Sequence, residues 1–516
     1  MKLHELHISD FKFFQDVESD NPLLRINGNH LLIYGENGSG KSTIYWALYT
    51  LLESSLKKSD DDIRKYFKKT GDESLVNIFS SGRNDTHIKA VLKDGANTKT
   101  YRVSRKSRDL SIRGNADVQE SNMASDFINY RVLFQLHNLK HSKNNDLWLW
   151  FAEEVLPYVK IGNDPCLNLY DKLKAGPEKV KNINGEDVFP TAALSKSKIE
   201  QEAKDYQKYK EYKKELKKWN DWLITFLKDI TIKANDLIQN EFKYKFKIKL
   251  DFNQKAFVIS ETDFKFYEPE IIISIPEFQS ITNPHIKKPH TFLNEAKWSA
   301  IGLSIRFAIL DIKLYTAELK TLVIDDMLLS LDMSNRDVVL DLLFSKYSND
   351  YQLLLMTHDR FLFELAQYKI SALRQTNWMY LEMFENENGG QPKPLFIERT
   401  NQIQKAWALF HAKELDLSAN TLRKATEKLC KAYLTKQERL NTDYSVKNLH
   451  DMIIAFQAKG TTSGLDAVKL TKLMEYKDRI LNPNSHYDIE TPLFKIELEK
   501  AIKTVEELAN DTGFNV

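Results

Sequence analysis

Residues 35–42 read Gly-Glu-Asn-Gly-Ser-Gly-Lys-Ser and follow an apolar run, Leu31-Leu32-Ile33-Tyr34, that has the length of a buried strand. Glycines let the backbone turn its N–H groups inward, the lysine reaches the β and γ phosphates, and the serine hydroxyl faces Mg²⁺. A helix beginning near Lys41 would add the positive end of its dipole. This order of strand, loop and helix predicts a site for ATP or GTP. The expected nucleotide contacts are Gly35, Glu36, Asn37, Gly38, Ser39, Gly40, Lys41, Ser42 and Thr43.

Length and composition indicate the number of domains and the compartment of the protein. The chain has 516 residues, of which 42% are hydrophobic, and a length near 150 residues per domain suggests about three domains. The net charge of +2 neither requires nor excludes a nucleic-acid partner. Two cysteines cannot form a disulfide framework, which favours a reducing compartment. With no long apolar stretch and no signal-peptide pattern at residues 1–5, we expect a cytoplasmic protein without membrane contact.

A second informative stretch is the apolar run of residues 322–326, which ends in Asp325 and Asp326 and lies about 280 residues after Lys41. A further apolar run at residues 353–356 leads to His358. At a shared phosphate site, Asp325 would hold Mg²⁺, Asp326 would orient or deprotonate the attacking water, and His358 would sense the γ-phosphate. The long separation predicts a large insertion between two halves of one site.

The order of these motifs resembles the ATP-binding cassette (ABC) ATPases of the SMC type, which include DNA-repair heads and ATPases of bacterial antiphage systems. The resemblance covers about residues 1–375. Besides the stretches above, it rests on residues 292–297 at the signature position and on residues 330–332 as the D-loop. It implies ATP and Mg²⁺ as cofactors and a homodimer, or a higher oligomer, in which two heads enclose two ATP molecules. Asn294 and Asp332 would then contact nucleotide, and Gln135, after the apolar run 132–134, would link the lobes and approach the metal.

The chain departs from that family in two places. Asp326 stands where the family has a glutamate, which moves the carboxylate back by one methylene, about 1.5 Å, so slow hydrolysis is expected. The signature position lacks the usual serine and glycines, although Asn294 still supplies a donor and the next residues a helix N-terminus. Taken alone, residues 290–310 also fit an ordinary amphipathic core helix.

The resemblance implies an α/β fold: an ABC-type head split by a short helical arm and followed by an all-α domain. The expected parts are residues 1–190 (first lobe), 191–241 (arm), 242–400 (second lobe) and 401–516 (helical domain). Opposite charges three and four residues apart in the arm predict a solvated helix, whose Lys and Tyr side chains would suit a nucleic-acid backbone of DNA or tRNA. Residues 6–14 alternate like an edge strand entering a turn.

The C-terminal region has its own polar pattern. Ser418 or Asn420 is expected to cap a helix that carries Arg423 and Glu427 four residues apart, and a later helix over residues 465–481 precedes His486. This pattern resembles the HEPN-like domains, in particular the C-terminal part of the PrrC and RloC anticodon nucleases. The resemblance implies a metal-independent ribonuclease with Arg423, Glu427, Arg479 and His486 as catalytic candidates, although Ile480 follows the arginine where a polar residue is common. A surface ion pair and a packed turn would give the same pattern.

Three functions therefore stay open. In the first, the chain is an ATP-gated ribonuclease of antiphage defence. In the second, it is the ATPase subunit of a multi-component system of the Septu type, which controls a separate nuclease or toxin and has a non-catalytic C-terminal domain. The third is a DNA-repair ATPase. The residues that separate the first two are Arg423, Glu427 and His486.

Overall fold

The computed structural model divides the chain into two compact units. The first comprises residues 1–30, 35–359 and 385–394, and the second comprises residues 31–34, 360–384 and 395–516. The four-part division expected from the sequence stays a prediction. The structure describes residues 1–15, 24–80, 86–129, 146–162, 164–181, 185–190, 200–253, 257–260, 262–279, 281–286, 288–289, 292–313, 317–327, 331–386, 391–398, 402–481 and 495–514.

An antiparallel sheet occupies the amino-terminal part of the first unit. Its strands lie in the order β2-β1-β4-β5. Strand β1 has a neighbour on each side, so the prediction that this segment forms an edge strand is wrong: β2, a strand of two residues, pairs with its other side. The bounds are β1 (Lys2–Ser9), β2 (Leu24–Arg25), β4 (His87–Asp94) and β5 (Asn97–Ser104).

Three parallel strands, in the order β17-β16-β6, form the layer that positions the acidic residues. Strands β16 and β17 are buried along their whole length, as expected for parallel strands covered on both faces. Helix α1 (Lys41–Glu53) packs against both of them. The bounds are β6 (Asp126–Asn129), β16 (Thr321–Asp325) and β17 (Gln352–Thr357).

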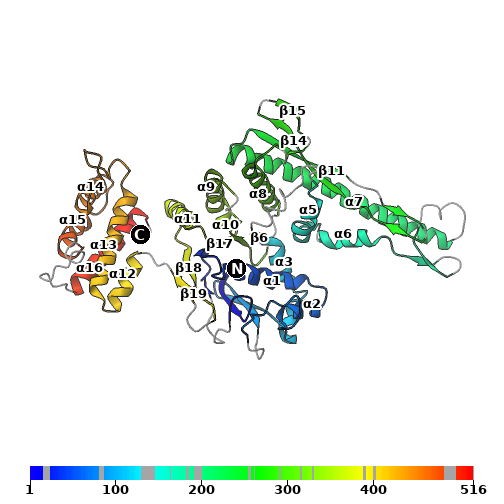
Figure 1. Cartoon of the computed structure of the whole chain (residues 1–516), viewed down its shortest axis with the longest axis horizontal. Helices are drawn as coiled ribbons and strands as arrows, with labels where there is room; N and C mark the ends of the chain where they lie inside the picture. Colours follow the sequence, from blue (N-terminus) through cyan, green and yellow to red (C-terminus); the bar gives the residue numbers. More distant parts are fainter. Residues whose placement is uncertain are drawn as a thin grey trace. The chain divides into compact units, whose positions relative to one another are not determined.

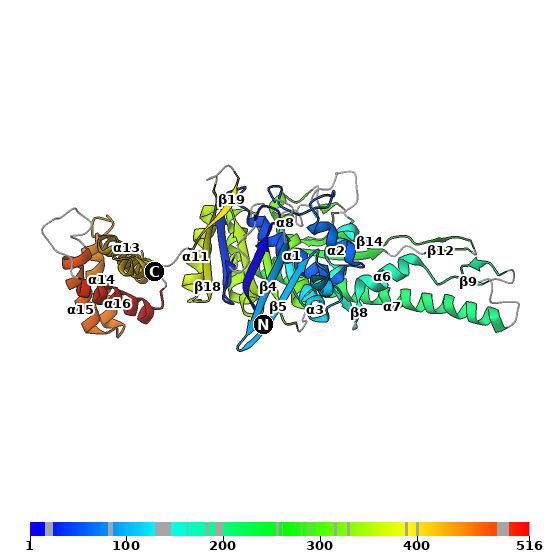
Figure 2. The ribbon, with the colours of Figure 1, turned by 90° about the horizontal axis from the view of Figure 1, so that it is seen from below.

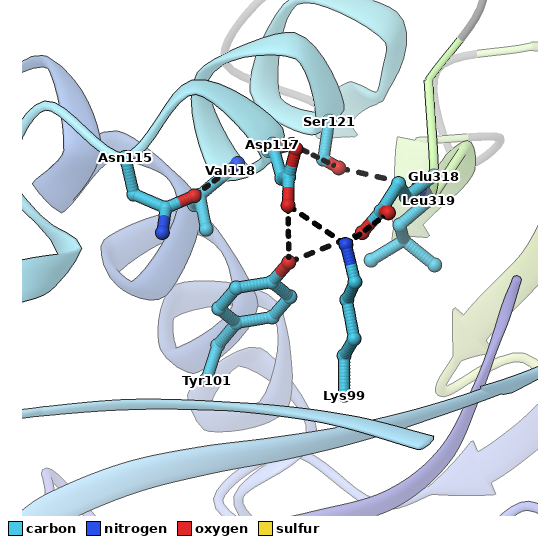
Figure 3. Close-up of polar contacts among 8 residues, drawn as sticks. All are labelled: Lys99, Tyr101, Asn115, Asp117, Val118, Ser121, Glu318 and Leu319. Atoms are coloured by element: carbon cyan, nitrogen blue, oxygen red, sulfur yellow. Dashed lines mark hydrogen bonds and ion pairs between the residues drawn. The ribbon is translucent and has the colours of Figure 1, made fainter. Parts of the chain in front are cut away.

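Polar contacts fix the amino end of β16 (Figure 3). The backbone N–H groups of Leu319 and Thr321 donate to the hydroxyls of Ser121 (3.3 Å) and Ser125 (3.1 Å). Nearby, the Lys99 ammonium from β5 lies between the carboxylates of Asp117 (2.8 Å) and Glu318. Since the start of β16 is held, its opposite end, which carries Asp325, has a defined position.

The arm predicted as a solvated helix is α7 (Glu200–Asp236), but one of its faces is buried. Tyr212, Leu216, Trp219 and Leu223 follow the spacing of a helical stripe and are all buried. Trp219 packs against Trp148 and Tyr170 with ring centroids 5.9 and 5.6 Å apart. The prediction failed because the charged residues, which cover the other face, dominated the composition. Both Figure 1 and Figure 2 show α7 beside α6 (Cys166–Ala175).

The second half of the first unit adds an antiparallel sheet in the order β11-β14-β15. Its strands are β11 (Phe246–Asn253), β14 (Glu270–Phe278) and β15 (Ile281–Ile286). Three short pairs are β7 (Lys160–Ile161) with β8 (Asp164–Pro165), β9 (Val180–Lys181) with β10 (Asp187–Val188), and β12 (Val258–Ile259) with β13 (Phe264–Lys265). The other α-helices of this unit are α2 (Asp60–Arg64), α3 (Ala116–Ala124), α5 (Trp148–Glu154), α8 (Glu295–Ile312), α9 (Met333–Leu342) and α10 (Ser348–Asp350). The 3₁₀-helices of this unit are η1 (Ser54–Leu56), η2 (Lys65–Phe67), η3 (Ser107–Ile112) and η4 (Leu156–Tyr158). Its π-helical segments are η6 (Leu237–Glu241) and η9 (Leu343–Tyr347).

The second unit holds strands β19-β18-β3 with helix α11, followed by a helical domain. Its elements are β3 (His30–Gly35), α11 (Arg360–Ala372), β18 (Trp378–Asn386), β19 (Lys393–Glu398), α12 (Gln402–His411), α13 (Leu415–Tyr433), α14 (Leu449–Thr462), α15 (Ala467–Tyr476), η10 (Lys477–Leu481) and α16 (Lys495–Thr512). Helices α12–α16 enclose one apolar core.

The expected cap at Ser418 or Asn420 is wrong, because α13 begins at Leu415 and the buried Ser418 hydroxyl donates to the Ala406 carbonyl at 2.7 Å. Among the helices that the structure describes, none combines the length and the apolar character needed to cross a bilayer.

The overall fold is thus α/β with a helical C-terminal region, as the sequence predicts.

Candidate nucleotide-binding site

The glycine-rich loop runs from the end of β3 into helix α1. Gly38 and Gly40 have φ values of 92° and 97°, in the left-handed region that favours glycine. At Gly40 a Cβ atom would also lie only 2.6 Å from a ring carbon of Phe13. Any larger residue there would be strained and would collide with that ring.

Lys41, the first residue of α1, points its amine back along the loop. Its Nζ donates to the carbonyl oxygens of Gly35 (2.6 Å) and Glu36 (3.0 Å). Burial lowers the pKa of Lys41, while the nearby carboxylates of Asp326 and Asp325 act in the opposite direction. The loop lysine and the acidic strand end, about 280 residues apart in sequence, therefore interact electrostatically in the folded chain.

Asp325 ends β16 and is only 7% exposed. Burial raises the pKa of this carboxyl to about 6, while a hydrogen bond with the Ser42 side chain lowers it. One oxygen, Oδ1, is buried and has no hydrogen-bond partner among the residues that the structure describes. A buried carboxylate oxygen without a donor, beside a serine hydroxyl, fits the oxygen ligand set that Mg²⁺ requires. Ser42 and Asp325 would hold the ion, which when bound neutralises phosphate charge.

Asp326 has an unusual backbone conformation, with φ at 49°. Aspartate tolerates this left-handed region better than most residues. The Asp326 N–H donates to the Met356 carbonyl (3.0 Å), and its Oδ1 accepts the His358 N–H (2.9 Å). The His358 Nδ1 lies 3.0 Å from the same oxygen. The carboxylate is thus held by the end of β17, where it is suited to orienting water or accepting a proton.

Two predicted nucleotide contacts serve as helix caps in this structure. The Asn294 side chain accepts the Lys297 N–H and caps α8, and the Asp332 side chain accepts the Asn335 N–H and caps α9. Both residues are exposed. Within the described ranges, these cap hydrogen bonds join each side chain to its own helix and not to the glycine-rich loop. Gln135, predicted to approach the metal, lies outside the described residues.

Sequence reasoning missed Asn129 and Arg306. Asn129 ends β6 and is the direct register partner of Asp325 in the neighbouring strand. Arg306, on α8, is buried and binds the Asp126 carboxylate and the Glu154 carbonyl (2.8 Å). No local pattern marks Asn129, because strand register is a long-range property. Arg306 did carry a signal, since a lone arginine among apolar residues needs a buried partner.

The C-terminal candidates do not all converge. Arg423 Nε lies 3.3 Å from Glu427 Oε1, and Arg423 also donates to the Leu481 carbonyl at 3.4 Å. Arg479, in contrast, pairs with Glu497 at 2.8 Å, and His486 lies outside the described residues.

One protein-family model matches the chain. Residues 5–255 are similar to the family described as an AAA domain, AAA_23. This span includes the glycine-rich loop and ends before the acidic strand. No curated protein matches the chain.

Several solved structures show a remote likeness. The Smc head domain with an extended coiled coil, bound to the C-terminal domain of ScpA, from Pyrococcus furiosus is 12% identical, covers 80% of this chain and 99% of its own, and has a TM-score of 0.39. The SMC head domain from Thermotoga maritima is 16% identical, with 77% and 100% covered and a TM-score of 0.32. The recombination mediator protein RecF with ATP, of the RecFOR pathway, is 12% identical, with 77% and 98% covered and a TM-score of 0.41. Over residues 5–255 the chain is thus similar to AAA domains.

Proposed function

We propose that the chain is a magnesium-dependent ATPase of the SMC-like ABC type. The observation that carries this proposal is the buried Oδ1 of Asp325, which has no hydrogen-bond partner in the described part of the chain. This carboxylate lies beside the Ser42 side chain at the start of α1 and within electrostatic reach of Lys41. A cation shared with a nucleotide triphosphate would satisfy that oxygen. Asp326 is the proposed residue for water activation and His358 the proposed γ-phosphate sensor. Gly35–Thr43, and with them Gln135, Asn294 and Asp332, remain the proposed nucleotide contacts.

The proposed working form is a head homodimer, or a higher oligomer built from it. Asn294 and Asp332 both lie at exposed helix starts, which leaves them accessible to a second copy. We further propose that the ATPase acts in the cytoplasm in antiphage defence, where it senses infection and controls a nuclease or toxin effector, with DNA or tRNA as a candidate ligand. Support comes from the motif resemblance and, for the compartment, from the unpaired, buried Cys166 and Cys430.

The test is ATP binding by calorimetry, together with phosphate release, with and without Mg²⁺. Lys41→Ala and Asp325→Ala are expected to lose hydrolysis by at least about a hundredfold, by analogy with other single groups that stabilise transition-state charge. Lys57→Ala is the control, because this lysine lies just beyond the far end of α1 and pairs with Glu53 at 2.8 Å. A wild-type chain that binds no ATP, or a Lys41→Ala variant that hydrolyses ATP normally, overturns the proposal.

A ribonuclease in the C-terminal domain is the second candidate, favoured by the Arg423–Glu427 pair beside the Leu481 carbonyl. A cation next to a carboxylate suits stabilisation of a phosphoryl transition state and proton transfer from a 2′-OH. The test is RNA cleavage on expression of the chain and of its Arg423→Ala, Glu427→Ala and His486→Ala variants. The control is Lys424→Ala, an exposed neighbour. Cleavage that these three variants lose and the control keeps supports the ribonuclease, whereas intact RNA throughout favours a separate effector.

A further inference from the structure

Helix α1 touches two neighbouring strand ends through two side chains on one face. Ser42 and Tyr45 are three residues apart, so both project from the same side of the helix. The Ser42 side chain forms a hydrogen bond with Asp325, and the Tyr45 hydroxyl accepts a hydrogen bond from Asn129 Nδ2 at 3.1 Å. Asp325 and Asn129 are direct partners in the parallel register of β16 and β6.

The surroundings of Tyr45 allow little freedom. Its ring is buried, meets Phe127 of β6 edge-on at 5.5 Å and stacks on Tyr49 of α1 at 6.4 Å. Burial raises the pKa of Tyr45 well above its ordinary value, so the phenol stays neutral. Its oxygen accepts the hydrogen bond from the Asn129 amide. The hydroxyl–amide contact therefore joins a buried side chain of α1 to the end of β6.

We propose that Asn129 is a positioning residue for the metal–nucleotide complex, acting through the Tyr45 hydroxyl. The contact fixes the rotation of α1 and thereby aims the Ser42 hydroxyl, one turn earlier, at the metal position beside Asp325. This inference rests on the proposed function. The glycine-rich loop and Lys41 bind phosphate without the metal, so Asn129 and Tyr45 affect the metal-dependent part of nucleotide affinity and leave the metal-independent part unchanged.

Helix α1 offers a matched control. Tyr49 lies one turn after Tyr45, is partly buried, and meets the same Phe127 ring edge-on at 5.4 Å. Its hydroxyl, however, lies 3.5 Å from that of Tyr158 instead of at a strand end. Tyr45→Phe and Tyr49→Phe each remove one hydroxyl oxygen from the same helix, and only the first removes the contact with Asn129.

The experiment measures ATP affinity of the full chain by calorimetry in EDTA and in saturating Mg²⁺. Tyr45→Phe and Asn129→Ala are expected to weaken the affinity in Mg²⁺ by about fivefold to tenfold, the value of one hydrogen bond, with affinity in EDTA unchanged. The double variant should lose no more than the single variants, since both act through one contact. Tyr49→Phe should stay within about twofold of wild type in both conditions.

The outcomes separate this inference from the proposed function. If the wild type binds no ATP in either condition, the proposed function fails. If the wild type binds ATP with Mg²⁺ and Tyr45→Phe behaves like Tyr49→Phe, the positioning role is overturned and the proposed function stands. Equal weakening in EDTA and in Mg²⁺ also overturns it, because that result indicates general damage to the fold. Thermal unfolding of each variant checks that the protein is folded. If Asn129→Ala does not fold, the comparison of Tyr45→Phe with Tyr49→Phe alone tests the positioning role.

Discussion

At the scale of single residues, Asp325 combines deep burial with a carboxylate oxygen that lacks a donor within the described residues. Its side chain is nearly inaccessible, and burial raises the pKa of the carboxyl to about 6. An acid whose pKa is higher in the folded state than in the unfolded state costs stability once both states ionise. Metal-free protein at pH 7 therefore carries an unfavourable charge that a cation would compensate.

Asp325→Asn should consequently stabilise the metal-free protein and abolish the effect of Mg²⁺ on ATP binding. The expected gain in the free energy of unfolding at pH 7 is about 1–3 kcal/mol, from about 1.4 kcal/mol per pKa unit. Urea denaturation in EDTA measures it. The control is Asp311→Asn, which removes a carboxylate that pairs with Lys346 at 2.6 Å and should give no gain. If Asp325→Asn instead lowers the free energy of unfolding, the Asp325 carboxylate already has favourable partners in the metal-free protein.

Residue types at this site were readable from the sequence, but their conformations were not. Asp325 and Asp326 were recognised because two carboxylates end an apolar run. The left-handed backbone of Asp326 and its hydrogen bond from His358 depend on the end of β17, about 30 residues later, which no local pattern encodes. Asn129 went unnoticed for the same reason, since its importance lies in its pairing with Asp325.

At the scale of elements, His30 binds the start of β17 within the first unit. Its Nδ1 accepts the Leu353 N–H at 3.0 Å, which requires a neutral ring. Burial, with a smaller contribution from Lys2, lowers the pKa of His30 to about 4. The unfolded chain binds this proton near pH 6.5, so the contribution of His30 is fully present above pH 6.5 and is lost as the pH falls toward 4.

We therefore expect the free energy of unfolding to decrease between pH 6.5 and pH 4, with His30 accounting for up to about 3 kcal/mol. The measurement is a series of denaturation curves at fixed ionic strength. His30→Gln keeps an acceptor and does not titrate, so its curve should be flatter over this interval. Identical pH profiles for the variant and the wild type would exclude this role.

Arg306 links helix α8 to strand β6 through Asp126, and both side chains are buried. Arg306→Met leaves an unpaired buried carboxylate and should lower the free energy of unfolding by about 3–5 kcal/mol. The double variant Arg306→Met/Asp126→Leu removes both charges and should recover most of that loss. Urea titration of the wild type, Arg306→Met, Asp126→Leu and the double variant gives the coupling free energy. Additive losses would mean that the two groups do not interact.

Elements with a regular local pattern were predicted well, and elements shaped by distant partners were not. The apolar runs at residues 31–34 and 353–356 lie within β3 and β17, and the run at residues 322–326 extends one residue beyond the end of β16 at Asp325. The start of α13 was misplaced because Ser418 donates to α12 and caps nothing. Likewise β1 looked like an edge strand because its second neighbour, β2, has only two residues.

At the scale of the whole molecule, the proposed head dimer makes each nucleotide site a product of two chains. Lys41→Ala would disable the loop of its own chain, and Asn294→Ala would disable the contribution to the partner's site. Each variant alone should be inactive, while an equimolar mixture should recover about a quarter of wild-type hydrolysis, because half of the dimers are mixed and each mixed dimer keeps one intact site. Mixed dimers that form without recovering activity would contradict a shared site.

The three parallel strands have a consequence for how the protein is made. Strand β6 is complete at residue 129, but its partner β16 begins only at residue 321. At about 5–20 residues per second, a ribosome needs roughly 10–40 s to supply that partner. During this interval the nascent chain carries strand β6, with Phe127 and Ile128, without its partner strand β16. We therefore expect chaperones to protect the first half of the chain as it emerges.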